Sequence, residues 1–171
     1  MMEVAGYQLA RRYGPVLDRV RTIADQASFL VRQKTRGQMP PVRIVVAAKK
    51  HCPEVVIRSQ QQTLGVDALP TRGGRCDYLG ITTLSADGVL VVINAGSAGS
   101  DRRMLDETVV HELVHVIQYG RPGVRETAVK ALRNNYGIER LPASKVWKLN
   151  RQISRDEREA ESLEYLARQI R

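Results

Sequence analysis

Two histidines with an intervening glutamate stand out in the stretch DETVVHELVHVIQYGRPG, where residues 111 to 115 are HELVH. The chain has three histidines among 171 residues. Shuffled sequences of this composition contain the pattern in roughly 0.2% of cases, so coincidence explains it poorly. On a helix, His111 and His115 share one face and can bind a zinc ion at about 2.0–2.1 Å. Glu112, about 100° around the helix, can take a proton from a zinc-activated water, which is the chemistry of amide hydrolysis.

This chemistry requires a helix over roughly residues 101 to 119, and the sequence favours one. Apolar residues follow helical spacing at Leu105, Val109, Leu113, Val116 and Ile117. N-cap candidates precede them at Ser97, Ser100 and Asp101, and Gly120 and Pro122 mark the end. Valines are weak helix formers, so packing must hold this helix, and we expect it to be buried. The alternative interpretation is a helix with two hydrogen-bonded surface histidines.

Two histidines leave a catalytic zinc site one protein ligand short. The third histidine, His51, lies far upstream. The extended metzincin motif requires glycine three residues after the second histidine, where this chain has Gln118. A carboxylate on a second helix downstream is the remaining common solution.

At this point the chain resembles the gluzincin metallopeptidases. The resemblance rests on HELVHVIQYG and on residues 157 to 161, EREAE, which are similar to the E-x-x-A-D signature of the gluzincin glutamate helix. It implies that Glu157 is the third zinc ligand and that Glu161, where the family has Asp, orients a ligand histidine. Two alternatives for the third ligand stay open. Glu161 shares a helix face with Glu157, and Asp156 lies closer to the apolar stripe of this helix.

The resemblance extends to a strand that ends in Asn94 and Ala95. This segment is similar to the gluzincin edge strand, whose Asn-Ala pair binds the backbone of the substrate, and Tyr136 is a candidate for stabilising the oxyanion. A short Gly/Ser linker joins the strand to the HELVH helix, so we expect an extended edge beside the zinc. The implied fold is a small α+β zincin domain. An N-terminal helix would pack on a twisted mixed β-sheet, with the HExxH helix beneath it and a C-terminal glutamate helix across the cleft.

The remaining patterns predict the other elements of one domain over residues 1–171. The expected helices are an amphipathic helix over 15–36, partly helical structure over 53–70, a short helix near 123–134 and a charged helix over 150–171. The expected strands are 42–48 and a hairpin of 78–85 and 89–95 with its turn at 86–88. A glycine-rich segment, 71–80, is interpreted as a loop because no phosphate-binding pattern accompanies it.

Composition limits the environment and the partners. No apolar run exceeds five residues and the N-terminus lacks an apolar signal region, so we expect a cytoplasmic protein without a membrane span. The net charge is +9, but the cations are scattered and aromatic residues make up only 5%, which disfavours nucleic-acid binding. An acidic protein partner, or solubility alone, explains the charge better. Cys52 and Cys76 are expected to be free thiols, with a disulfide as the alternative, and His51 and Cys52 to lie in a loop.

The sequence therefore predicts a compact zinc endopeptidase that acts on peptide or protein substrates. The alternative is a structural module, associated with a virion or a plasmid, that retains a metal-binding zincin fold. Such a module would have no need of Glu112. A basic nucleic-acid-binding module is a third hypothesis.

Overall fold

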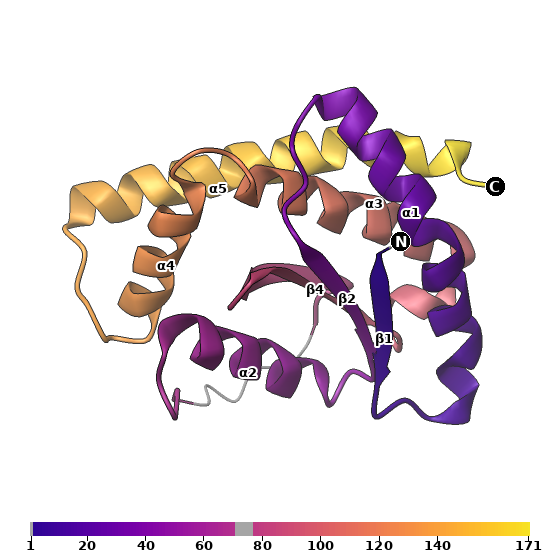
Figure 1. Ribbon diagram of the computed structural model, residues 1–171, viewed down its shortest axis with the longest axis horizontal. Coiled ribbons are helices and arrows are strands. Elements are labelled where there is room, and N and C mark those ends of the chain that lie inside the picture. The colour runs from indigo at the N-terminus through magenta and orange to yellow at the C-terminus, as the bar shows by residue number, and fades with distance from the viewer. Residues whose placement is uncertain (1, 71–76) are drawn as a thin grey trace.

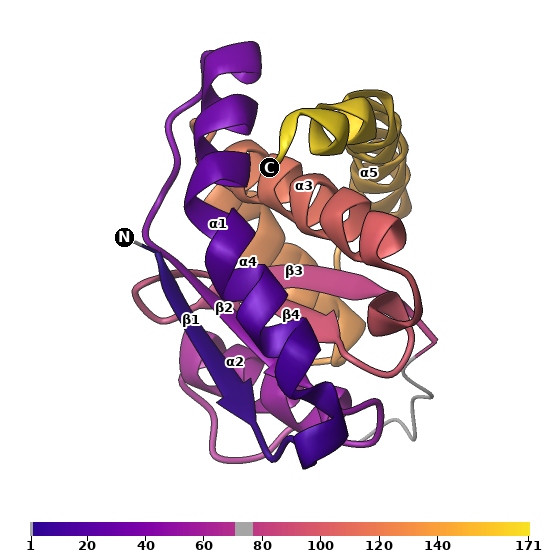
Figure 2. The same ribbon diagram turned by 90° about the vertical axis from the view of Figure 1, so that its right-hand side faces the viewer.

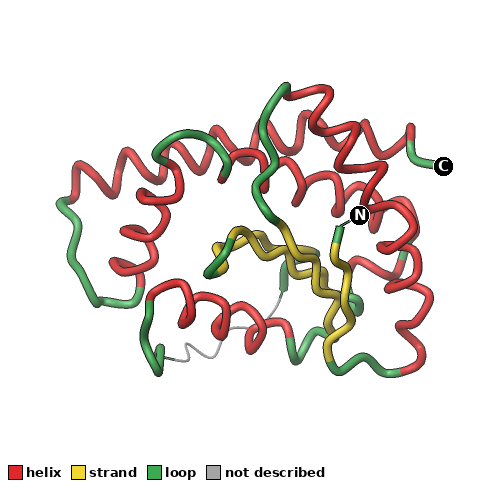
Figure 3. Tube along the Cα trace, viewed as in Figure 1, coloured by secondary structure: helices red, strands yellow, loops and turns green. Residues whose placement is uncertain are grey.

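The computed structural model describes residues 2–70 and 77–171. Their four strands form one mixed sheet in the order β1-β2-β4-β3. β1 (Glu3–Tyr7), β2 (Val42–Ala47) and β4 (Gly88–Asn94) are parallel, while β3 (Gly80–Ser85) runs antiparallel to β4 at one edge. Helices lie on both sides of this sheet (Figures 1 and 3). The predicted α+β class is confirmed.

The two faces of the sheet carry separate cores because side chains alternate along each strand. Ile44 and Val46 of β2 belong to the larger core, with α1 (Gly14–Thr35) and α3 (Arg102–Tyr119). Val45 and Ala47 belong to the smaller core, under α2 (Cys52–Leu64). Strands buried on both faces read as continuous apolar runs, which explains why IVVAA and VLVVI lack alternation.

α3 lies at the centre of the helical layer. It packs against α1, against β3 and β4, and against α5 (Ala143–Leu163), which continues into a short 3-10 helix over Glu164–Gln169. α5 lies on the side of α3 that faces away from the sheet (Figure 2). α4 (Val124–Asn135) connects the two, and the N-terminal half of α5 extends past the end of α3 (Figure 1).

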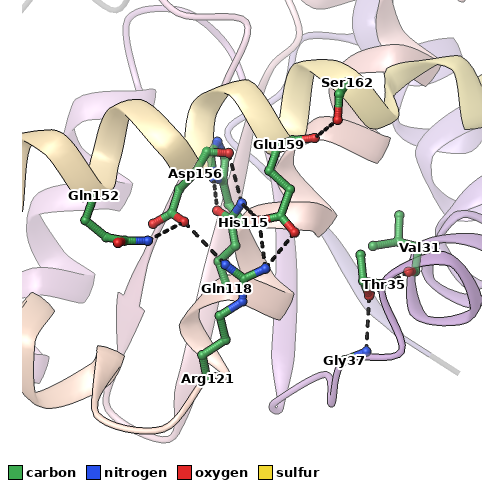
Figure 4. A network of polar contacts seen from close by, with 10 residues as sticks. All are labelled: Val31, Thr35, Gly37, His115, Gln118, Arg121, Gln152, Asp156, Glu159 and Ser162. Carbon is green, nitrogen blue, oxygen red and sulfur yellow. Dashed lines mark hydrogen bonds and ion pairs between the residues drawn. The ribbon is translucent and has the colours of Figure 1, made fainter.

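The C-terminal end of α3 is fixed by two close backbone approaches. A Cβ at Gly37 would lie 2.3 Å from Ile117 Cγ2, and a Cβ at Gly120 would lie 2.5 Å from the carbonyl oxygen of Gln38. The Thr35 hydroxyl donates to the Val31 carbonyl at 2.8 Å and accepts from the Gly37 amide at 3.2 Å (Figure 4). The loop after α1 therefore presses on the last turns of α3, and only glycine fits at these two positions.

Most predicted elements are confirmed within a few residues, among them α1, β2, the β3–β4 hairpin, α3 and α4. Three predictions need correction. β1 was missed, α5 begins at Ala143 instead of residue 150, and β4 is an interior strand instead of an edge. β4 is interior because it pairs with β2 on one side and β3 on the other, so the edge beside α3 is β3. No helix among the described residues is both long and apolar enough to cross a membrane.

Candidate metal centre

The HELVH segment lies in the second half of α3, as predicted. Asp101 is the N-cap, and its side chain accepts from the Arg103 amide at 2.7 Å. Val109, Val110 and Val114 are almost fully buried, which agrees with a helix held by packing more than by propensity. His111 and His115 are partly buried on the face that α5 covers.

The two imidazoles converge with the carboxylate of Glu157 on α5. The Nε2 atoms of His111 and His115 are 3.1 Å apart. Glu157 Oε2 lies 3.5 Å from His111 Nε2, and Glu157 Oε1 lies 3.4 Å from His115 Nε2. All three ligand atoms lie within 4.8 Å of one another. The three residues that the sequence predicted as ligands are thus brought together by two helices.

The contacts of the two Nδ1 atoms show which ring nitrogens can bind a metal. His111 Nδ1 lies 2.8 Å from Glu164 Oε1, and His115 Nδ1 lies 2.7 Å from Gln118 Oε1. Carboxylate and amide oxygens accept hydrogen bonds, so each Nδ1 must carry the proton. Each neutral ring then presents the lone pair of Nε2 to the other and to Glu157.

Gln118 has only one sensible amide orientation. Its Nε2 donates to the Asp156 carbonyl at 2.9 Å and to Glu159 Oε2 at 3.0 Å (Figure 4). Both partners are acceptors, so the amide nitrogen must face them and the amide oxygen must face His115. The side chain is buried, with 4% exposed, so these contacts are shielded from water. Gln118 therefore fixes the tautomer and the orientation of His115.

This donor set fits a zinc ion. With both Nε2 atoms unprotonated, three acceptor atoms face one another at 3.1, 3.5 and 3.4 Å, an arrangement that a bound cation would stabilise. Bonds of about 2.0–2.1 Å in a tetrahedron give ligand–ligand distances of about 3.3 Å. Two imidazoles with one carboxylate are also a common protein ligand set of catalytic zinc.

Glu112 lies beside this cluster and is buried, with 5% exposed. The Thr82 hydroxyl lies 2.7 Å from Glu112 Oε2, to which it donates, and 3.1 Å from the Glu112 carbonyl oxygen. Burial raises the pKa of the Glu112 carboxyl to about 7, although Thr82 and His115 act in the opposite direction. A carboxylate with a pKa near neutrality is suited to accept and return protons.

Gly80, at the start of β3, makes room for this carboxylate. A Cβ at this position would lie 2.7 Å from Glu112 Cγ and 2.8 Å from Oε1. Gly80 also lines a pocket of about 250 Å³ that opens beside His111 and Glu112. The other lining residues are Leu79, Met104, Glu107, Thr108, His111, Glu112 and Glu164. The pocket lies between the edge strand and α3, and both His111 and Glu112 line it.

Glu161 does not have the predicted position. It is exposed, and within the described residues it forms no hydrogen bond or ion pair with either histidine. Glu164, almost two turns after Glu157, contacts His111 instead. Asp156, the other alternative ligand, accepts from Gln152 and faces Arg121 (Figure 4).

Asn94 and Ala95 do not have the position that the resemblance implies for a substrate-binding pair. Asn94 and Ala95 are buried, with 0% and 2% exposed, on the interior strand β4. The Asn94 amide donates to the Tyr78 carbonyl and to the Ser97 hydroxyl, and its oxygen accepts from the Gly96 amide. This side chain stabilises the turn after β4 and is not available to a substrate backbone.

Three further sequence candidates lie away from the cluster. The Tyr136 hydroxyl donates to Gln60 on α2, at a different pocket from the one at His111. His51 and Cys52 form the N-terminus of α2 and not a loop. Cys52 Sγ lies 3.7 and 3.5 Å from the carbonyl oxygens of Ala47 and Ala48. Cys76 and most of the glycine-rich segment lie outside the described residues, so the thiol prediction stays a prediction.

Sequence reasoning assigned no role to Thr82, Gly80, Gln118 or Glu164. Gln118 and His115 are three residues apart, a spacing that places side chains together on a helix and so could have been noticed. Glu164 lies on the same helix face as Glu157, because seven residues make almost two turns of a helix. Thr82 and Gly80 have no local signal, because β3 meets α3 only through the tertiary fold.

Comparisons with protein-family models, with characterised proteins and with solved structures gave no match, so the chemistry of this site must be argued from its own residues.

Proposed function

We propose that this protein is a zinc-dependent peptidase. The observation that carries the proposal is the convergence of His111 Nε2, His115 Nε2 and the Glu157 carboxylate next to the buried Glu112. A site built only to stabilise the fold needs metal ligands but no proton acceptor. Glu112 is held by Thr82 and accommodated by Gly80, an arrangement that serves a reacting group better than a core residue.

Zinc in this site would polarise the scissile carbonyl and make a water molecule acidic near neutral pH. Glu112 accepts the proton of that water and passes it to the leaving amine. Thr82 holds one oxygen of Glu112 and leaves the other facing the pocket side, where Gly80 lies. Glu164 and Gln118 keep both imidazoles in the tautomer that a metal requires.

A peptide substrate suits the edge of the sheet. Within the described residues β3 pairs with no strand other than β4, so its outer edge near Gly80 offers a place for an added strand. At the other end of β3 the Leu84 carbonyl already accepts from the Ser59 hydroxyl of α2, so the added strand would be short. β3 begins at Gly80, next to Glu112, so a peptide added there would pass the metal cluster. This edge replaces the Asn94–Ala95 strand as the proposed substrate-binding element.

The N-terminal half of α5 supports an acidic protein as substrate or partner. Residues 143–155 contain Lys145, Lys148, Arg151 and Arg155 but neither Asp nor Glu. Trp147 is 60% exposed on this segment, and the Arg151 guanidinium lies 5.3 Å from its ring centroid. Glu157 lies on the same helix two residues after Arg155 and ten residues after Trp147, so an acidic chain bound here would extend along α5 toward the proposed metal site.

The test is hydrolysis of an unstructured protein such as casein by wild type and by Glu112→Gln. The variant should retain zinc and lose at least about 100-fold in turnover, because it removes the proton acceptor and leaves the ligands. Glu126→Gln makes the same chemical change at an exposed position of α4 and should cleave as wild type does. Unchanged turnover in Glu112→Gln would refute the proposed role of Glu112.

A further inference from the structure

Arg121 connects the two ligand-bearing helices although it touches neither the metal cluster nor Glu112. It directly follows Gly120 at the end of α3. One terminal nitrogen lies 2.6 and 2.7 Å from the two carboxylate oxygens of Glu159 on α5. The other lies 3.4 Å from Asp156 Oδ1. Figure 4 shows the guanidinium inserted between these two carboxylates.

Glu159 in turn contacts the residue that holds His115. Its Oε2 accepts from Arg121 and also from Gln118 Nε2, at 2.7 and 3.0 Å. Gln118 then accepts from His115 Nδ1 at 2.7 Å. A continuous chain of hydrogen bonds therefore runs from Arg121 through Glu159 and Gln118 to a metal-ligand ring.

The same contacts fix the second helix. Asp156 and Glu159 flank Glu157 in the sequence, so holding both of them sets the position of the ligand carboxylate. The Asp156 carboxylate also accepts from Gln152 at 2.8 Å, and its backbone carbonyl accepts from Gln118 at 2.9 Å. The N-terminal half of α5 extends past α3 (Figure 1), and these contacts join the C-terminal end of α3 to the second half of α5.

We propose that Arg121 is a positioning residue of the metal centre, acting on His115 through Glu159 and Gln118 and on Glu157 through its hold on α5. The inference rests on the proposed metal site and not on the peptidase reaction. Partners of metal-ligating side chains typically change metal affinity by about 10- to 100-fold when they are removed. Loss of Arg121 should cost about tenfold, at the lower end of this range, because Arg121 acts on His115 through Glu159 and Gln118.

The experiment is zinc affinity, measured by competition with a chelating dye, for wild type, Arg121→Met, Gln118→Met and the double variant. We expect each single variant to lose about 10- to 100-fold. The double variant should lose clearly less than the product of the two, because both act through one chain of contacts. Cobalt(II) in Arg121→Met should give a shifted visible absorption band, since the ligand geometry changes.

Arg19→Met is the matched control. Arg19 on α1 donates two hydrogen bonds to the Asp106 carboxylate on α3, at 2.9 and 2.6 Å. This pair joins α1 to α3 and contacts none of the three proposed ligands. Arg19→Met should lower the melting temperature and leave zinc affinity within about twofold of wild type. If Arg121→Met does not fold, Glu159→Gln tests the same contact without loss of volume.

Two results would overturn the inference. Zinc affinity of Arg121→Met, or of Glu159→Gln, within about twofold of wild type would refute the positioning role alone. A loss no larger than that of Arg19→Met would reduce Arg121 to a stabilising residue. If wild type itself binds no zinc, the proposed function fails together with this inference. If wild type binds zinc and Arg121→Met binds it equally well, only this inference fails. The titration of wild type therefore tells the two failures apart.

Discussion

Gly80→Ala should impair hydrolysis without disturbing metal binding. Gly80 contributes no side chain to the cluster, yet its added Cβ would lie 2.7 Å from Glu112 Cγ and 2.8 Å from Oε1. Ordinary contact with a Cβ begins at 3.4 Å, so the Glu112 side chain would have to move by at least the 0.7 Å difference. The side chain is buried and held by Thr82, which leaves the carboxylate little room to rotate away without losing this bond.

A displacement of about 1 Å in a catalytic group costs on the order of 100-fold in rate. We therefore expect kcat/KM to fall by about 100-fold in Gly80→Ala, which corresponds to about 2.7 kcal/mol of activation free energy. Zinc affinity should stay within about threefold of wild type, because the three atoms nearest to the new methyl group all belong to Glu112, which is not a ligand.

The assay is hydrolysis of casein by the zinc-loaded protein, with zinc stoichiometry measured on the same sample. Gly14→Ala is the matched control, because a Cβ at Gly14 on α1 meets no atom within 4 Å. Equal activity of Gly80→Ala and Gly14→Ala would refute the argument that Gly80 makes room for a reacting carboxylate. Loss of zinc together with activity would refute it as well, because the defect would then lie in the ligands.

Further variants test the ligands, the pH response and the basic surface. Glu157→Ala should lower zinc affinity by at least about 100-fold while Glu161→Ala stays within about twofold, and the reverse order would overturn the assignment of the third ligand. Glu164→Leu should cost about 10- to 100-fold in zinc affinity through His111, and an unchanged value would leave Glu164 without a role. In metal-free protein the raised pKa of Glu112, about 7, means that the folded state binds the proton more tightly than the unfolded state. The protonated Glu112 carboxyl therefore stabilises the folded state in acid, and this stabilisation is lost as the pH rises through 7. The free energy of unfolding falls by about 3 kcal/mol at most from this cause. Glu112→Gln should therefore gain in melting temperature relative to wild type between about pH 5 and pH 8, and a constant difference would contradict this. Trp147 is the single tryptophan, so its fluorescence should respond to a glutamate-rich peptide more than to a lysine-rich one, with a response that weakens in salt.

The HELVH helix could be predicted because its signals are local. Apolar spacing, an N-cap and a terminal glycine define α3, and two histidines four apart share a face on any helix. These inferences need only the period of a helix. Glu157 was reached through the resemblance and the small-then-acidic pattern behind it, although the apolar stripe of its helix lies closer to Asp156.

The surroundings of the ligands could not be predicted, because they depend on how elements cross. The pattern around Glu157 favoured Glu161 as the partner of a histidine, but α5 passes His111 nearer its end, where Glu164 stands as the helix tightens to 3-10. The resemblance implies that Asn94 contacts a substrate, but β2 lies beside β4 and Asn94 is buried. Strand order and helix crossing are tertiary facts that one segment does not carry.

The zinc content of protein purified without chelators tests the central claim most directly. Elemental analysis of wild type should give about one equivalent of zinc per chain, and Glu157→Ala prepared in parallel should give clearly less. Wild type with well under half an equivalent of any transition metal would contradict the account, because His111, His115 and Glu157 would then have converged without a metal to hold.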